Sequence, residues 1–94
     1  MSHALLLSIL TPEQVVFEGE VQYLSVPGTA GYMGILVDHA PIISSLKPGA
    51  FEVRLPSGDK TLHFVTQQPG FLEVSQNKVS ILLDAADSSV LLRP

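Results

Sequence analysis

The chain has 94 residues, of which 46% are hydrophobic and 15% charged, and its formal net charge is −4. This length and this hydrophobic content predict one folded domain rather than a disordered chain. Nucleic acid and anionic membrane surfaces are not expected as partners, because both require clustered positive charge. The five basic residues are scattered along the chain: Lys47, Arg54, Lys60, Lys78 and Arg93. The absence of cysteine excludes disulfides and thiolate metal sites.

The first apolar stretch, Ala4 to Leu10, predicts a strand rather than a leader or a membrane anchor. It is far shorter than the ~20 residues of a membrane-spanning helix. No Lys or Arg precedes it, and Thr11-Pro12-Glu13 is not a small-residue cleavage site. We therefore expect no direct membrane insertion.

Glycine and proline then punctuate the chain about every eight to twelve residues, which is typical of β-sandwiches and barrels. The predicted strands cover residues 4–10, 14–18, 20–26, 32–37, 42–47, 51–55, 61–64, 71–75 and 78–83. Apolar residues at 51, 53 and 55 alternate with polar ones, which indicates a half-buried antiparallel hairpin with 61–64. The predicted fold class is all-β, a compact antiparallel β-sandwich or flattened barrel of about ten short strands.

Several turns have specific signals. Gly19 predicts a bulge or bend, Pro48-Gly49 a type II turn, and Gln76-Asn77 a two-residue hairpin turn. Residues 27–31 and 38–41 are predicted loops. In the tail, Ala85-Ala86 could form one helical turn, and residues 90–92 could form an edge strand. We place the domain at residues 1–86 and a short tail at 87–94.

The histidines do not predict a metal site. They are His3, His39 and His63, and they lack the paired spacing that zinc sites show. Asp38 and His39 lie near two serines, Ser44 and Ser45, which resembles the parts of a catalytic triad, but no nucleophile elbow is present. We interpret 38–41 as a loop in which Asp38 caps backbone amides and His39 packs or forms hydrogen bonds locally.

Other candidate sites are equally incomplete. The glycines Gly28, Gly31 and Gly34 do not form a dinucleotide fingerprint, and residues 58–61 lack the upstream glycine of a P-loop. Glu18 and Glu20 could form a carboxylate pair, but without aromatic platforms for a sugar we interpret them as solvated charges on an edge strand. We therefore expect no catalytic residues, no cofactor, no metal and no small-molecule substrate.

Three segments resemble the signature of the epsilon subunits of F-type ATP synthases: Gly31-Tyr-Met-Gly34, His39-Ala40-Pro41 and Leu46-Lys47-Pro48-Gly49. Residues 70–74, 77–79 and 81–85 resemble the last strands of that family, and 11–13 followed by 16–17 resembles its start. The resemblance extends over about residues 5–86.

This resemblance implies a ten-stranded sandwich that acts as a non-catalytic subunit of the rotor. Such a domain lies at the foot of the central stalk, between the gamma subunit and the polar loops of the membrane c-ring. It helps to couple proton or sodium flow to ATP synthesis. The implied location is peripheral, on the cytoplasmic face of an energy-coupling membrane such as the bacterial inner membrane.

The resemblance also implies two contact regions. The loop facing the c-ring should consist of Thr29, Ala30, Gly31, Tyr32 and Met33. The junction between gamma and the c-ring should contain Leu10, Thr11, His39, Ala40 and Pro41. Family members often have an acidic residue where this chain has Tyr32, so we expect a hydroxyl hydrogen bond and ring packing there instead.

Most family members continue into two helices that can inhibit ATP hydrolysis and, in some bacteria, bind ATP. The resemblance covers the sandwich without these helices, so we expect hairpin-based inhibition and ATP binding to be absent if Pro94 is the natural end, which the sequence leaves open. Two other function classes are the alternatives. A free-standing sandwich that binds a small ligand or an extracellular partner requires a concave apolar pocket, and an enzyme requires convergent carboxylates or a nucleophile with a base.

Overall fold

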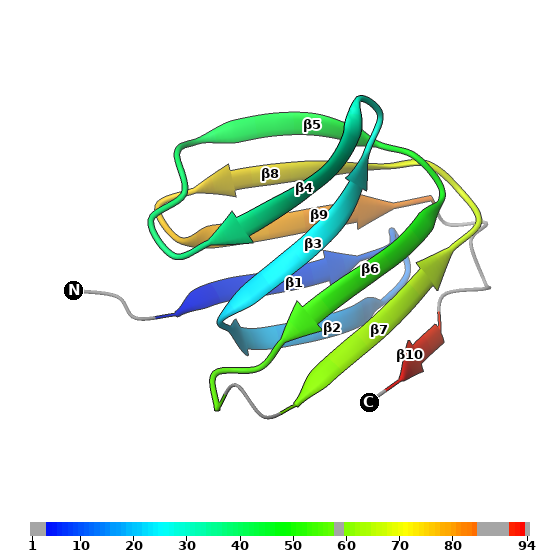
Figure 1. Cartoon of the computed structure of the whole chain (residues 1–94). Helices are drawn as coiled ribbons and strands as arrows, with labels where there is room; N and C mark the ends of the chain where they lie inside the picture. Colours follow the sequence, from blue (N-terminus) through cyan, green and yellow to red (C-terminus); the bar gives the residue numbers. More distant parts are fainter. Residues whose placement is uncertain (1–3, 58–59, 85–90, 94) are drawn as a thin grey trace.

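The protein is described by a computed structural model, which covers residues 4–57, 60–84 and 91–93. These residues form ten β-strands (Figure 1). The strands are β1 (Leu5–Leu10), β2 (Val15–Val21), β3 (Tyr23–Gly28), β4 (Gly31–Leu36), β5 (Ile42–Leu46), β6 (Gly49–Arg54), β7 (Thr61–Thr66), β8 (Gly70–Ser75), β9 (Lys78–Leu83) and β10 (Leu91–Arg93).

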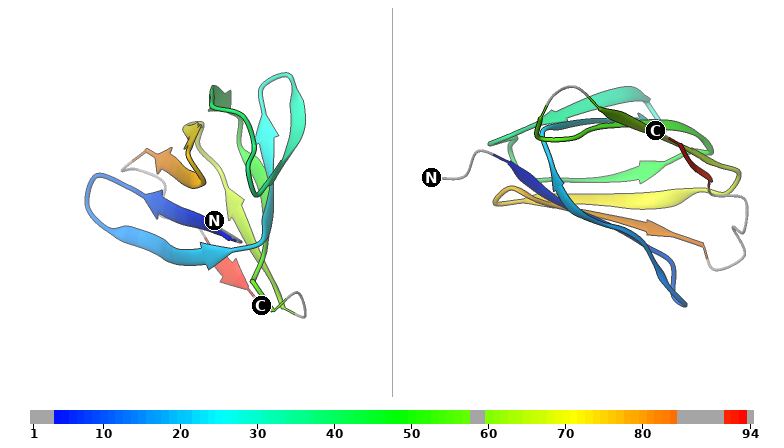
Figure 2. Two further views of the ribbon diagram at one scale, coloured as in Figure 1. Left: turned by 90° about the vertical axis from the view of Figure 1, so that its left-hand side faces the viewer. Right: turned by 90° about the horizontal axis from the view of Figure 1, so that it is seen from below.

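The strands form two layers of a sandwich, which Figure 2 shows from two sides. One layer has the order β5-β8-β9-β1-β2, and the other has the order β4-β3-β6-β7-β10. The pair β1–β9 is parallel, and the remaining pairs are antiparallel. The layers meet where β3 reaches β5, in the single register pair Gly28–Leu46. The predicted fold class is confirmed.

Alternation along the strands fills the space between the layers. In β1, Leu5, Leu7 and Ile9 are buried, while the residues between them face outward. The same period of two recurs in β8 and β9, because successive side chains of a strand point to opposite faces. The ring of Phe17 meets Phe64 edge to face with centroids 6.0 Å apart. An interior void beside the Phe64 ring, bordered also by Ile9 and Phe51 among others, has no room for a water molecule.

All nine predicted strands are confirmed, with bounds that differ by a few residues. The predicted Gln76-Asn77 turn is confirmed as well: both residues have positive φ, 52° and 62°, as the type I′ hairpin turn requires. The predicted edge strand in the tail is present as β10, which pairs with β7. The possible helical turn at Ala85-Ala86 lies outside the described residues.

Two turn predictions are wrong. Gly49 is the first residue of β6, and Gly31 is the glycine with positive φ in the described part of the chain. A type II turn needs positive φ at its glycine, so Pro48-Gly49 does not form one. Gly19 lies in regular register opposite Leu7, and the bulge of this strand pair occurs instead where the register shifts between Ile9 and Leu10.

Candidate functional site

The hairpin of β3 and β4 contains the whole predicted c-ring loop, and it projects at the top of the view in Figure 1. Thr29 and Ala30 form its tip, between the register partners Gly28 and Gly31. Gly31 has φ +134°, a conformation that side chains rarely adopt, and Gly28 has no space for a side chain. A Cβ at Gly28 would lie 2.8 Å from the Gly31 carbonyl oxygen. The two glycines therefore permit this tight tip.

The tip is attached to the opposite layer by backbone hydrogen bonds. The Thr29 N–H donates to the Ser45 carbonyl at 3.1 Å, and the Lys47 N–H donates to the Pro27 carbonyl at 2.9 Å. Pro27 is buried and its ring fixes φ, which further limits movement at the end of β3. The hairpin tip is thus attached to β5 as well as to its own sheet.

The side chains of the tip divide into an exposed and a packed set. Thr29 and Ala30 are exposed, and Tyr32 has 61% of its surface exposed. Met33 is half-buried and packs against the hydrophobic core. The Tyr32 hydroxyl lies next to Gly49, 3.6 Å from where a Cβ would be. The tip therefore offers an aromatic ring, a hydroxyl and small side chains to a partner.

The second predicted region, His39-Ala40-Pro41, joins β4 to β5. The His39 ring is half-buried, with Nδ1 2.7 Å from the carbonyl oxygen of Ala40, which confirms a local role for this ring. Asp38 has φ +67°, and its backbone N–H donates to the side-chain oxygen of Asn77 at 2.6 Å. In return the Asn77 amide donates to the Asp38 carboxylate at 3.0 Å. The predicted capping role is therefore reversed, since Asn77 caps the amide of Asp38.

The residues predicted at the junction between gamma and the c-ring lie at opposite ends of the sandwich. Ile42, next to Pro41, is in register with Val74 at the far end of β8, while Leu46 is in register with Gly70. Leu10 pairs with Leu82, at the same end as Gly70. At about 3.3 Å a residue, the length of β5 separates the two ends by roughly 15 Å. Leu10 and Thr11 thus share an end with the hairpin tip, and His39 does not.

The triad candidates are engaged elsewhere. Asp38 is held by Asn77, and His39 by the Ala40 carbonyl. The Ser44 hydroxyl donates to the carbonyl of Ser45. No pair among these side chains makes the hydrogen bonds that relay a proton in a triad.

The other candidates have structural positions. The glycines Gly28, Gly31 and Gly34 belong to the β3–β4 hairpin, where the Tyr23 ring covers Gly34. Glu18 and Glu20 are exposed on β2, an edge strand, which confirms the interpretation as solvated charges. Residues 58 and 59 lie outside the described residues.

Within the described residues, no three His, Asp or Glu side chains come together in a way that could hold a metal ion. The same part of the chain contains no helix with the length and apolar character needed to cross a membrane.

Asn77 is the site residue that the sequence did not reveal. Besides its contacts with Asp38, its carbonyl accepts the Leu6 N–H at 2.8 Å, so it links a hairpin turn, a loop and the start of β1. Its turn was recognisable from the sequence, but its partners are 39 and 71 residues away in the chain.

The sequence comparisons identify the family. Residues 4–89 match the model of the ATP synthase delta/epsilon chain, beta-sandwich domain. The chain belongs to this family. It is 43% identical over 83 residues to the ATP synthase epsilon chain of Leptospira borgpetersenii, covering 88% of this chain and 63% of that one. It is 39% identical over 90 residues to that of Maridesulfovibrio salexigens, covering 96% of this chain and 61% of the relative. The chain thus spans about three fifths of the length of these relatives.

Solved structures share the fold. A chain in the mitochondrial ATP synthase of Euglena gracilis, solved as an OSCP/F1/c-ring assembly, superposes with a TM-score of 0.84 at 21% identity and covers 98% of this chain and 55% of its own. A chain in the central stalk and c-ring of the Tetrahymena thermophila enzyme gives a TM-score of 0.68 at 15% identity, covering 85% and 63%. At these identities, the likeness concerns the fold alone.

Proposed function

We propose that this chain is a non-catalytic rotor component of an F-type ATP synthase, which connects the gamma subunit with the polar loops of the c-ring. It helps to couple ion flow through the membrane to ATP synthesis, and it is peripheral to the membrane through that complex. The proposal is supported by membership of the delta/epsilon family and by relatives that are named ATP synthase epsilon chains.

The observation that carries the proposal is the construction of the β3–β4 tip. A contact that transmits torque must resist displacement, and this tip is attached through Thr29 to β5 in the opposite layer and through Pro27 to Lys47, the residue after β5. It nevertheless exposes Ala30 and Tyr32. We assign the c-ring contact to this tip. Tyr32 supplies a ring and a hydroxyl, which suit a contact that is partly apolar and partly wet.

Because the 39–41 segment lies at the opposite end of β4, the two regions contact different partners when the domain stands on its tip. The tip then rests on the ring, and Ala40 and Pro41 face away from the ring towards gamma. Both Ala40 and Pro41 are exposed, as this contact requires.

Binding to the cognate gamma subunit is the first test. Purified chain and gamma should form a complex at micromolar concentrations, as measured by co-purification or calorimetry. Failure to form that complex would contradict the rotor assignment.

The orientation is tested by disulfide crosslinking in assembled ATP synthase, because the chain has no cysteine of its own. Ala30→Cys should crosslink to a cysteine placed in the polar loop of the c subunit. Ala40→Cys is the matched control, since it replaces another exposed alanine at the opposite end of β4. Equal crosslinking of both variants to the c subunit, or crosslinking of Ala40→Cys alone, would contradict the proposed orientation.

A further inference from the structure

The outer edge of β4 is the least protected edge of the sandwich. Unpaired backbone groups at a sheet edge attract further strands, and proteins usually prevent this with charges, with proline, with very short edge strands or by covering the edge. The edge strand β2 has exposed charges at Glu18 and Glu20, β10 has three residues, and Ser45 of β5 is bonded to Thr29 of the tip. The six residues of β4 include no charge and no proline, and in the described part of the chain the strand that pairs with β4 is β3.

The backbone groups at this edge can be identified from the pairing with β3. Pro27 is in register with Tyr32, and its carbonyl oxygen is bonded to the segment after β5, so it faces away from β4. Backbone groups of an antiparallel strand alternate between its two edges, so Tyr32, Gly34 and Leu36 direct their N–H and C=O groups away from β3. The Leu36 carbonyl also accepts the His39 N–H at 3.1 Å and has a second lone pair. Three residues of β4 are therefore available for a further strand.

The sequence of this edge is complementary to itself. When a second copy of β4 pairs antiparallel about a two-fold axis at Gly34, Tyr32 of each copy lies opposite Leu36 of the other. These two side chains have exposed fractions of 61% and 59%, and an aromatic residue opposite an aliphatic one is a stabilising cross-strand pair. At the axis, the Tyr23 ring of the same copy covers Gly34. A slip by two residues would place Tyr32 opposite Gly34 and lose this contact.

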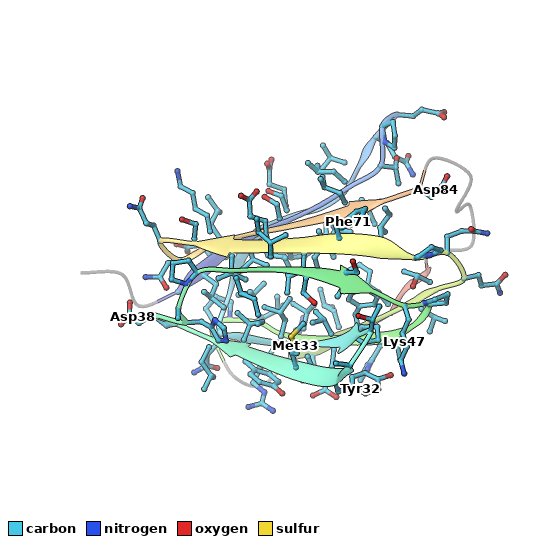
Figure 3. All side chains as sticks on the ribbon, turned by 90° about the horizontal axis from the view of Figure 1, so that it is seen from above. Tyr32, Met33, Asp38, Lys47, Phe71 and Asp84 are labelled. Atoms are coloured by element: carbon cyan, nitrogen blue, oxygen red, sulfur yellow. The ribbon has the colours of Figure 1, made fainter. Side chains whose placement is uncertain are left out.

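The charges near the two ends of β4 favour the same arrangement. Figure 3 shows Lys47 beside Tyr32 at one end of the molecule and Asp38 at the other end. Both charged residues are exposed. Antiparallel pairing brings the tip end of one copy beside the 38–41 segment of the other, so unlike charges approach each other at both ends.

We propose that two copies of the free chain associate through β4, antiparallel and centred on Gly34, so that their β4-β3-β6-β7-β10 layers form one continuous sheet. This self-association goes beyond the proposed function. One consequence rests on that function: because Tyr32 takes part in the dimer and in the c-ring contact, the two contacts exclude each other.

Sedimentation equilibrium of the wild-type chain is the first test. An interface of one strand from each copy is smaller than the ~1,200–2,000 Å² of stable complexes, so the dimer should be weak and reversible. Between about 1 μM and about 1 mM, a range that covers weak association, the average mass should rise towards twice that of one chain. A monomer over this whole range would overturn the proposal.

The double variant Tyr32→Lys/Leu36→Lys tests the edge itself. It places lysines opposite each other in the proposed register, and lysine on an edge strand opposes pairing. The matched control, Val65→Lys/Phe71→Lys, adds the same charge at exposed apolar positions (46% and 58%) on β7 and β8. The β4 variant should raise the dissociation constant at least tenfold and the control less than threefold, with thermal unfolding verifying that each is folded. An unchanged β4 variant, or an equal loss in the control, would overturn the edge as the contact.

Disulfide crosslinking tests the register, because the chain has no cysteine of its own. Positions 32 and 36 of different copies should have Cα atoms about 5.5 Å apart, within the range of a disulfide. Equal positions of the two copies are separated by four residues, or roughly 13 Å, which is too far. Under mild oxidation, a mixture of Tyr32→Cys chains and Leu36→Cys chains should form a covalent dimer, and neither variant alone should. Equal crosslinking in either variant alone would overturn the register.

An assembly of the cognate gamma subunit and c-ring separates this inference from the rotor assignment. Added to the wild-type dimer, the assembly should bind single copies and dissociate the dimer, as measured by the masses of the complexes. Binding of an intact dimer would overturn the exclusion between the two contacts. Absence of any binding would contradict the rotor assignment and leave the dimer intact, whereas absence of the dimer in sedimentation would leave the rotor assignment intact.

Discussion

Replacement of Asn77 should weaken the end of the sandwich that lies away from the hairpin tip. The Asn77 side chain accepts the Asp38 N–H at 2.6 Å and donates to the Asp38 carboxylate at 3.0 Å. Its own backbone has φ +62°, in the left-handed region that asparagine and glycine tolerate. Asn77→Gly removes the two side-chain bonds and keeps the backbone conformation. Asn77→Ala removes the bonds and also forces a side chain into that region.

The expected losses follow from these two contributions. An intramolecular hydrogen bond contributes about 0.5–1.5 kcal/mol net, so Asn77→Gly should lower the free energy of unfolding by about 1–2 kcal/mol. A left-handed residue other than glycine costs about 1–2 kcal/mol, so Asn77→Ala should lower it by about 2–4 kcal/mol. In a domain of this size, each kcal/mol lowers the melting temperature by about 4–8 °C.

Urea unfolding monitored by circular dichroism measures both variants, with the slope m compared first to verify a two-state transition. Gln76→Gly is the matched control, because Gln76 is exposed, lies in the same turn and also has positive φ. The control removes no side-chain contact to Asp38 and should raise the free energy of unfolding by up to about 1–2 kcal/mol, because glycine relieves the left-handed cost at position 76. If Asn77→Gly were as stable as Gln76→Gly, the Asp38 contacts would contribute nothing. If Asn77→Ala were as stable as Asn77→Gly, the argument from backbone conformation would be wrong.

Two further stability predictions come from packing. Gly70→Ala should lower the free energy of unfolding in urea by at least about 2 kcal/mol, because its Cβ would lie 2.6 Å from the Leu82 carbonyl oxygen. Gly19→Ala places its Cβ 3.6 Å from the Phe17 ring, an ordinary contact, and should lower the free energy of unfolding by less than half as much. Equal costs would contradict the steric argument. Ile81→Ala, at a fully buried position, should cost about 2–5 kcal/mol, and Ile43→Ala, at a position 76% exposed, less than about 0.5 kcal/mol. A small loss at Ile81 would indicate that the core collapses around the deletion.

The strands were predictable from the sequence because their signals are local. Glycine and proline mark the turns, and alternation marks strands such as β6, where Phe51 and Val53 are buried between more exposed neighbours. Turn types at tertiary contacts were less predictable. Pro48-Gly49 resembles a type II turn, but the neighbouring Lys47 N–H is bonded to Pro27 of β3, and Gly49 continues into β6. The pairing of the strands therefore overrides the local preference of Pro-Gly for a type II turn.

The candidate site was predictable in part. The family resemblance placed the tip residues on one loop, and the β3–β4 hairpin contains them. The resemblance did not indicate that Leu10 shares an end with this tip, while His39 lies at the other end. That relation depends on the register of β5, β8, β9 and β1, and register results from side-chain packing across strands that are distant in the chain.

The outward-facing residues Phe71 and Leu82 show why an exposed apolar surface is not visible in the sequence. Phe71-Leu72 and Leu82-Leu83 are pairs of neighbouring apolar residues, and alternation alone does not reveal which member of each pair faces outward. In the structure Leu72 and Leu83 are buried, so Phe71 and Leu82 are the outward members.

The register also connects β8 mechanically to the tip. Ser45 pairs with Phe71 of β8, and its carbonyl accepts the Thr29 N–H of the tip. Lys47, two residues further along the chain, donates to Pro27, so two backbone hydrogen bonds flank the Gly28–Leu46 pair that joins the layers. A force applied to the tip therefore has a short route through β5 into the layer that contains β8, β9, β1 and β2.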